Sequence, residues 1–254
     1  MLPKEFKPKF SYDLIRLGKN HDGGYLIEKS SLVKSYGLVS FGLGLDWSFE
    51  QDFFKYNNCP IEVYDHTIRY SSLKKFSRNT LINFFSLKNW NKKNINILLN
   101  NLFIFYNYKK FFTGTVKHLR ESIGLGNKSI RLEQILKKFK YRPIFLKVDI
   151  EGCEYRILDE IINFQEYFSG LVIEFHNIDL HKEKIITFIN KLNLDLVHIH
   201  GQNAEYLDLN NDPIQVEMTF SKNPKIISNS LVLPHKLDKP GNPNFDEIVL
   251  NFDD

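Results

Sequence analysis

Short runs of apolar residues, each ended by a polar group, recur along the chain and predict the strands of a sheet. The clearest run, 144–148, reads Ile-Phe-Leu-Lys-Val and stops at Asp149. Similar runs occupy 38–41, 61–64, 170–176 and 194–199, and a final alternating run occupies 216–220. Nearly continuous apolar runs of this length are typical of parallel strands that are covered on both faces.

Between these runs, the apolar residues are spaced three or four positions apart, as in amphipathic helices. The segments 154–162 and 181–192 each place their apolar residues on one helical face. Ser48 is expected to cap the helix that follows it, and Ser129 to cap a helix at 129–139. Strands that alternate with helices predict an α/β fold with a mostly parallel sheet.

Residues 68–128 are too long for an ordinary crossover between two strands. They contain amphipathic stretches near 71–85 and 92–112 that are rich in Phe, Tyr and Asn. We interpret the chain as a single domain, 1–254, with an inserted helical lobe at about 68–128. The lobe is expected to overhang the functional site.

The bulk composition excludes several classes of protein. The 254 residues are 43% hydrophobic, enough for a full core, and the net charge of +4 is carried by Lys residues scattered along the chain. Without a dense basic block, no nucleic-acid partner is predicted. The N-terminus lacks a signal-peptide core, and no apolar run reaches the ~18 residues of a membrane span. Two cysteines, Cys59 and Cys153, indicate reduced thiols in a cytoplasmic protein.

A glycine turn follows the strand at 38–41. Gly42 and Gly44 let the backbone approach a ligand closely, and Asp65 ends the next strand, 21 residues after Gly44. This is close to the spacing of about 20 residues at which an acidic group meets a ribose in nucleotide-binding units. Trp47 stands where the dinucleotide fingerprint has its third glycine. The pattern therefore disfavours an NAD-dependent oxidoreductase and favours another adenosine ligand.

Polar side chains follow neighbouring strands of the expected sheet at the point where each strand ends. Asp149, Glu174 and His176 should converge there, because the carboxyl ends of parallel strands meet at one edge. His200 joins them if its own strand lies nearby. Several titratable groups at one strand-end edge indicate a functional site.

Several motifs resemble those of the FkbM-type S-adenosylmethionine-dependent methyltransferases. The central one, residues 146–154, reads Leu-Lys-Val-Asp-Ile-Glu-Gly-Cys-Glu, close to the family's Lys-(Ile/Val)-Asp-(Val/Ile)-Glu-Gly-Ala-Glu. The supporting motifs are Asp22-Gly-Gly-Tyr25, Gly42-Leu-Gly44 with Phe49-Glu50, Val-Tyr-Asp65-His-Thr, Glu174-Phe-His176 and His198-Ile-His200-Gly-Gln-Asn203. Cys153 replaces the family's small Ala. Together the motifs extend from about residue 16 to 220.

The resemblance implies a Rossmann-like class I methyltransferase sheet, mostly parallel with its last strand antiparallel, that binds S-adenosyl-L-methionine. The residues that it implies for cofactor binding are Asp22, Gly42, Gly44, Glu50, Asp65 and Asp149, with Asp65 on the ribose hydroxyls. Family members commonly methylate sugar or polyketide hydroxyls, many of them in surface-polysaccharide biosynthesis. The expected activity is therefore O-methylation of a free or nucleotide-linked sugar.

Methyl transfer to a hydroxyl needs close positioning and a way to remove the hydroxyl proton. His176 or His200 could act as the base, with Asp149 beside it. Alternatively, Asp149, Glu174, His176 and His200 could hold a divalent cation, Mn or Mg, that lowers the pKa of the hydroxyl. A lone base does not require two carboxylates at neighbouring strand ends, which favours the metal.

Other functions stay open at this point. A nucleic-acid or protein methyltransferase would share the cofactor half, but the sequence shows no basic stripe with interleaved aromatic residues and no Pro-Pro-Tyr-type motif. A methyltransferase acting on a non-sugar acceptor is also compatible with the motifs. So is a non-catalytic Rossmann-like binding subunit, in which the strand-end cluster only ties loops together.

Overall fold

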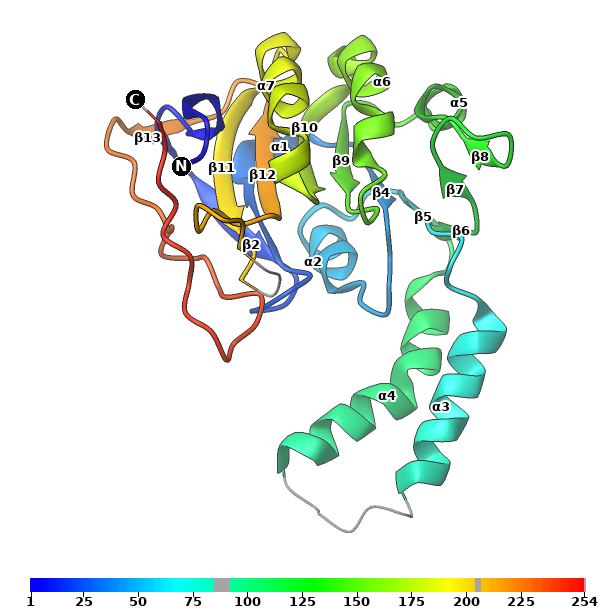
Figure 1. The fold of residues 1–254 in the computed structure, drawn as a ribbon. Coiled ribbons are helices and arrows are strands. Elements are labelled where there is room, and N and C mark those ends of the chain that lie inside the picture. The colour runs from blue at the N-terminus through cyan, green and yellow to red at the C-terminus, as the bar shows by residue number, and fades with distance from the viewer. Residues whose placement is uncertain (85–91, 204–206, 254) are drawn as a thin grey trace.

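A seven-stranded sheet forms the centre of the computed structural model, which describes residues 1–84, 92–203 and 207–253 (Figure 1). The strands are, in spatial order, β11 (Asp195–Gly201), β12 (Val216–Ser221), β10 (Phe168–Phe175), β9 (Ile144–Val148), β4 (Gly37–Phe41), β5 (Ile61–Tyr64) and β6 (Val116–Leu119). The pairs from β10 to β6 are parallel, whereas β12 is antiparallel to both β10 and β11. This is a Rossmann-like, mostly parallel sheet whose last strand is antiparallel, so the predicted fold class is confirmed.

The sequence of β9 shows how the sheet acquires two apolar faces. Its five residues are all buried, and alternate residues point to opposite faces. Ile144, Leu146 and Val148 enter the larger apolar cluster, and Phe145 enters the second cluster. Lys147 follows Phe145 on the second face. The polar residue of the central strand, Lys147, therefore lies on the face of Phe145, and the other face is entirely apolar.

Helices cover both faces of the sheet (Figure 1). The larger cluster receives side chains from α5 (Leu132–Lys138), α6 (Leu158–Asn163) and α7 (Lys182–Lys191). The second receives them from α1 (Lys29–Lys34), α2 (Ser48–Asn57) and the antiparallel hairpin of β2 (Leu14–Leu17) and β3 (Tyr25–Glu28). The short remaining elements are β1 (Ser11–Tyr12), β7 (Ser122–Ile123), β8 (Ser129–Ile130), β13 (Ile226–Ser228) and the single turns at Lys4–Phe6, Glu154–Arg156, Gln165–Tyr167 and Ile178–Leu180.

Two helix starts differ from the sequence prediction. α2 begins at Ser48 itself, whose backbone N–H donates to Oδ1 of Asp46 over 3.0 Å, so Asp46 supplies the acceptor expected from Ser48. α5 begins at Leu132, because Ser129 is drawn into pairing with Ser122 between β8 and β7. Local capping preferences are overridden in both places by contacts of the neighbouring loop.

The segment of the expected lobe contains two helices, α3 (Tyr70–Phe84) and α4 (Lys92–Phe111), which form a hairpin that projects from the body (Figure 1). Residues 85–91 of this segment lie outside the described residues. The base of the hairpin packs through ring contacts of Tyr108 with Trp47, 5.8 Å between centroids, and of Phe111 with Phe54, 6.3 Å. Its assignment as a lobe over the acceptor stays a prediction.

The C-terminal tail wraps the surface and adds pairing that the sequence pattern did not predict. β13 pairs with β1 near the N-terminus, and Phe252 forms a bridge with Leu2. Within the described parts of the chain, no helix is long and apolar enough to cross a membrane.

Candidate functional site

A cavity of about 470 Å³ opens at the carboxyl ends of β4, β5, β9 and β10. The expected site residues that line it are Asp22, Gly42, Gly44, Glu50, Asp65, Asp149, Glu174 and His176. The chain leaves β4 toward β5 on one side, and β9 lies on the other, so the cavity sits at a switch point of the sheet. Ligands of open α/β sheets bind at such points.

The glycine turn needs its glycines for two different reasons. Gly42 has a φ of 85°, and a Cβ there would lie 1.7 Å from the carbonyl oxygen of Asp149. The turn after β4 is thus pressed against the end of β9. Gly44 has a φ of 55° and no atom within 4 Å of a Cβ position, so its bare backbone borders open space.

Asp65 shapes this turn from the end of β5. Its Oδ2 accepts the N–H groups of Leu43 (3.0 Å) and Gly44 (3.1 Å), and its Oδ1 accepts the N–H (2.7 Å) and hydroxyl (2.6 Å) of Thr67. Burial alone would raise the pKa of Asp65, but these bonds outweigh it and lower the pKa. The four bonds match the four acceptor sites of a carboxylate. A role on ribose hydroxyls stays a prediction that requires some of these bonds to be exchanged.

Lys147 places a positive charge beneath the cavity. Its side chain is 6% exposed, and Nζ lies 3.2 Å from the carbonyl oxygen of Gly42, 3.6 Å from Asp149 and 3.9 Å from Glu50. Burial would lower the pKa of Lys147, but the carboxylates of Glu50 and Asp149 outweigh it and raise the pKa. The residue is therefore a buried ammonium, which costs free energy unless it is paired.

Glu50 points an unsatisfied oxygen into this buried region. Oε1 accepts the hydroxyl of Ser40 over 2.6 Å, whereas Oε2 is buried without a hydrogen-bond partner among the described residues. Burial raises the pKa of Glu50, although Lys147 and Ser40 work in the opposite direction. A buried acceptor without a donor is costly, and a ligand donor would remove that cost.

Tyr25 joins the two strand-end carboxylates. Its hydroxyl lies 3.0 Å from Oδ2 of Asp149 and 2.7 Å from Oε2 of Glu174, and Gln215 donates to the other oxygen of Glu174. Burial, then the charges of Asp149 and Glu217, raise the pKa of Glu174 well above its usual range. One hydroxyl proton serves one carboxylate at a time, so a proton retained on Glu174 lets both contacts be hydrogen bonds.

His176 lies at the rim, where Glu154 fixes its ring. Nδ1 is 3.0 Å from Oε1 of Glu154, which also accepts the backbone N–H of His176 over 2.7 Å. Nε2 is left toward the cavity, 3.5 Å from Glu151 and 3.9 Å from Glu174. Burial would lower the pKa of His176, but the bond to Glu154 and the charges of Glu154, Asp149 and Glu151 raise it.

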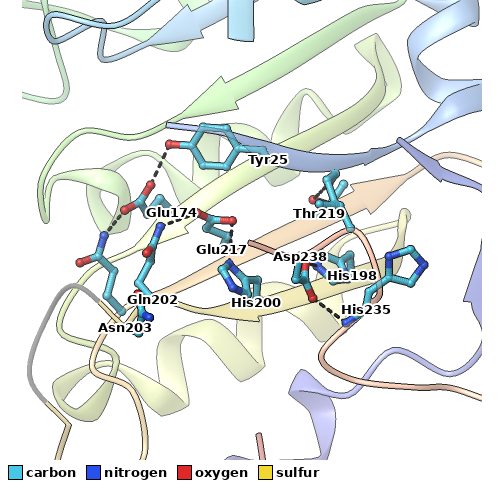
Figure 2. Close-up of polar contacts among 12 residues, drawn as sticks. Tyr25, Glu174, His198, His200, Gln202, Asn203, Glu217, Thr219, His235 and Asp238 are labelled. Atoms are coloured by element: carbon cyan, nitrogen blue, oxygen red, sulfur yellow. Dashed lines mark hydrogen bonds and ion pairs between the residues drawn. The ribbon is translucent and has the colours of Figure 1, made fainter. Parts of the chain in front are cut away.

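His200 does not join this group. β12 lies between β10 and β11, so Glu217 stands in the row between Glu174 and His200 (Figure 2). The His200 ring is 3.3 Å from Glu217 through Nδ1 and 2.9 Å from Glu247 through Nε2. Burial would lower its pKa, but the bonds to both carboxylates raise it to about 10. The expectation that His200 acts as base or metal ligand is corrected, because both ring nitrogens are occupied.

The structure also separates the four expected metal ligands. Glu174 is engaged by Tyr25 and Gln215, and His200 lies elsewhere. Among the residues described, the group that could hold a metal ion consists of Asp149, Glu151 and His176, with one ligand atom each within 4.8 Å of the others. Glu151 has an 88% exposed side chain and a φ of 53°.

Sequence reasoning missed Lys147, Tyr25 and Glu154 as members of the site. Lys147 interrupts an otherwise apolar strand, which is a signal in itself, because buried lysines require partners. Tyr25 and Glu154 stood in the motifs but had no assigned role. Nothing in their local sequence shows that Tyr25 reaches Glu174 or that Glu154 reaches His176.

Comparisons with known proteins bear on the fold alone. No family model and no curated protein matches the chain. Among solved structures, the chain is similar to an rRNA methylase from Streptococcus thermophilus, with 9% identity, a TM-score of 0.38, and coverage of 76% of this chain and 92% of that one. It is also similar to the 16S rRNA methylase ArmA, with 12% identity, a TM-score of 0.30, and coverage of 76% and 77%. TM-scores this low carry no argument about the acceptor.

Replacement of Glu174 by Gln tests the proton on that residue. A carboxyl whose pKa is raised by folding binds its proton more tightly in the native state, so the free energy of unfolding falls as pH rises above ~4.3. Glu174→Gln removes this dependence on pH. As pH rises, the free energy of unfolding of the variant should therefore increase relative to that of the wild type by at most about 1.4 kcal/mol per pH unit. Urea unfolding between pH 4 and 8 measures the difference. Glu166→Gln, on an exposed side chain, is the control, and identical slopes in wild type and Glu174→Gln would contradict the assignment.

Proposed function

We propose that the chain is an S-adenosylmethionine-dependent O-methyltransferase whose cofactor lies in the cavity at the ends of β4, β5 and β9. The observation that carries the proposal is the combination of a class I methyltransferase sheet with a glycine turn and a carboxylate-lined cavity at its switch point. When bound, S-adenosylmethionine supplies an electrophilic methyl group on a positively charged sulfur.

The residues of the cavity fit a cationic adenosine ligand. The bare backbone at Gly44 leaves space for a close approach, and the orphaned Oε2 of Glu50 is an acceptor that lacks a donor. Asp22, Glu50 and Asp149 add negative charge to the wall. The buried Lys147 offsets part of this charge and holds Gly42 and Asp149 in place. Asp65 would meet the ribose by exchanging its bonds to the turn for bonds to the hydroxyls.

The acceptor class follows from the resemblance to FkbM-type methyltransferases. We assign a sugar hydroxyl, on a free or nucleotide-linked sugar, as the expected target. Support comes from the central motif, whose Asp149 and Glu151 both line the cavity. A hydroxyl bound at this edge would lie among hydrogen-bonding groups rather than on an apolar wall.

We assign removal of the hydroxyl proton to Nε2 of His176. Glu154 holds Nδ1, fixes the ring orientation and stabilises the imidazolium that forms when the proton is taken up. The structure weakens the earlier argument for a metal, because Glu174 is accounted for by Tyr25 and Gln215. Asp149, Glu151 and His176 could still bind a divalent cation, Mn or Mg, which would lower the pKa of the hydroxyl.

A second candidate is a non-catalytic binding subunit. The contacts of Tyr25 with Asp149 and Glu174 favour it, because they tie the β2–β3 hairpin to the ends of β9 and β10 and so give both carboxylates a structural role. In this case the protein would bind the cofactor and transfer no methyl group to any hydroxylated acceptor.

The cofactor assignment predicts tight binding of S-adenosylhomocysteine by titration calorimetry. Asp65→Ala should weaken it by on the order of 1–3 kcal/mol, because charge-assisted bonds to two hydroxyls are lost. Glu62→Ala, on the strand that Asp65 directly follows but outside the cavity, should bind like the wild type. Binding of NADH without binding of S-adenosylhomocysteine would rule out the methyltransferase assignment.

Chelation separates the base from the metal. With His176 as the base, EDTA leaves methyl transfer unchanged, and His176→Gln lowers kcat by about 10²–10⁴-fold. His235→Gln, outside the cavity, should retain full activity. Loss of activity in EDTA with recovery in Mn or Mg, and equal damage from Asp149→Asn and His176→Gln, would instead establish the metal site.

The pH dependence of kcat follows from the raised pKa of His176. The base must be neutral, so activity should rise with pH through a pKa above the ordinary value of ~6.5. Glu154→Gln removes the partner that stabilises the imidazolium and should move this limb to lower pH. Glu151→Gln should move it less, because water screens that exposed carboxylate. A limb at or below pH 6.5 in the wild type would exclude His176 as the base.

A further inference from the structure

The hairpin of α3 and α4 carries a concentrated positive charge. Residues 66–120 contain eleven Lys and Arg and no Asp or Glu, whereas the rest of the chain contains 23 basic and 30 acidic residues. Seven of these eleven lie on α3 and α4, the two helices of the projecting hairpin (Figure 1). The exposed basic residues with described side chains are Lys74, Lys75 and Arg78 on α3, and Lys109 and Lys110 on α4. Within the described chain, none of these five forms an ion pair with an acidic group.

An apolar stripe runs along the exposed face of α4 beside this charge. Leu99, Phe103 and Tyr106 are 41%, 53% and 62% exposed. Their spacing of four and three residues places them on one side of the helix, and Lys110 continues the same row. The stripe is thus a continuous ridge, unlike single apolar residues on an ordinary surface.

The stripe is separate from the face by which α4 is held to the body. Ile104 is buried, and Tyr108 packs against Trp47 and hydrogen-bonds to His118 over 2.6 Å. The other nitrogen of His118 lies 2.9 Å from the backbone oxygen of Asp65. The base of the hairpin is therefore fixed beside the glycine turn, while the ridge points outward.

We propose that the α3–α4 hairpin binds the surface of a membrane that contains anionic lipids. A helix with Leu and aromatic residues on one exposed row and lysines around it is suited to the boundary between headgroups and acyl chains. At 20 residues, α4 is about 30 Å long and is too polar to cross a bilayer, so it would lie along the surface. Anionic headgroups would supply the negatively charged partners that these lysines lack.

The chemistry of the ridge favours a membrane over RNA as the polyanion. Single-stranded RNA is bound by separate aromatic rings that stack on bases within a basic groove. The ridge instead contains the aliphatic Leu99 in the same row as Phe103 and Tyr106. The cavity lining includes none of the described residues of α3 or α4, so the ridge is not part of a groove that leads into the cavity. This proposal does not depend on methyl transfer. If both hold, the hairpin fixes the cavity beside the membrane surface.

Vesicle co-sedimentation tests the proposal with the full chain. Vesicles of equal parts phosphatidylglycerol and phosphatidylcholine should bind the protein, and pure phosphatidylcholine should bind it much more weakly. Lys109→Gln and Lys110→Gln should each weaken binding by about fivefold, the effect of one charge near an anionic surface. Leu99→Ser combined with Phe103→Ser should abolish binding, and raised salt should weaken it in the wild type.

Matched controls keep the test independent of folding. Leu180→Ser and Lys4→Gln change exposed residues on the body and should bind vesicles like the wild type. All variants should retain the wild-type circular dichroism and thermal midpoint, because the replaced side chains are exposed. Equal binding by the ridge variants and the wild type, or binding of an RNA oligonucleotide without binding of vesicles, would overturn the proposal. A wild-type dimer that Phe103→Ser converts to a monomer would also overturn it, by assigning the ridge to a second copy.

Discussion

The ammonium group of Lys147 lies inside the carboxyl end of the sheet, with the Gly42 carbonyl, Asp149 and Glu50 within 4 Å. Removing a charge from water costs several kcal/mol, so this arrangement holds only while its partners stay in place. The partners come from three separate segments: the glycine turn, the first turn of α2 and the end of β9. Because all three segments contact one buried cation, the floor of the cavity depends on the fold that brings them together.

Two groups of buried charge share the functional face of the sheet but have different consequences. Beside the cavity, Glu154 holds Nδ1 of His176, whereas Nε2 faces the cavity with Glu151 3.5 Å away. Further along the sheet, His198 is 2.8 Å from Asp238, and His200 contacts Glu217 (Figure 2). The other ring nitrogen of His200 contacts Glu247. In the second group, Nε2 of His198 and Nε2 of His200 contact the tail at Asp238 and Glu247, and Nδ1 of His200 contacts Glu217 of β12, which suits a structural role. A ring nitrogen that faces the cavity is what distinguishes His176.

The hairpin of α3 and α4 is attached to the body by contacts close to the cavity. Its base is tied to the glycine turn through Trp47 and through His118, whose ring reaches the backbone of Asp65. A rigid base gives an exposed ridge a fixed orientation relative to the cavity. The unpaired charge and the exposed apolar row therefore belong to a defined surface.

Local patterns in the sequence determined the strands at 61–64 and 144–148, the parallel α/β class and the presence of Asp149, Glu174 and His176 at one edge. These features depend on periodicity and on the ends of strands, both of which neighbouring residues encode. The tertiary structure alone decided that β12 separates His200 from the site and that Glu154 orients His176. It also decided that Tyr25 bridges two carboxylates that are distant in the sequence, Asp149 by 124 residues and Glu174 by 149. These features depend on the order of the strands in the sheet and on contacts between charged groups that are distant in the sequence. No local sequence pattern encodes either.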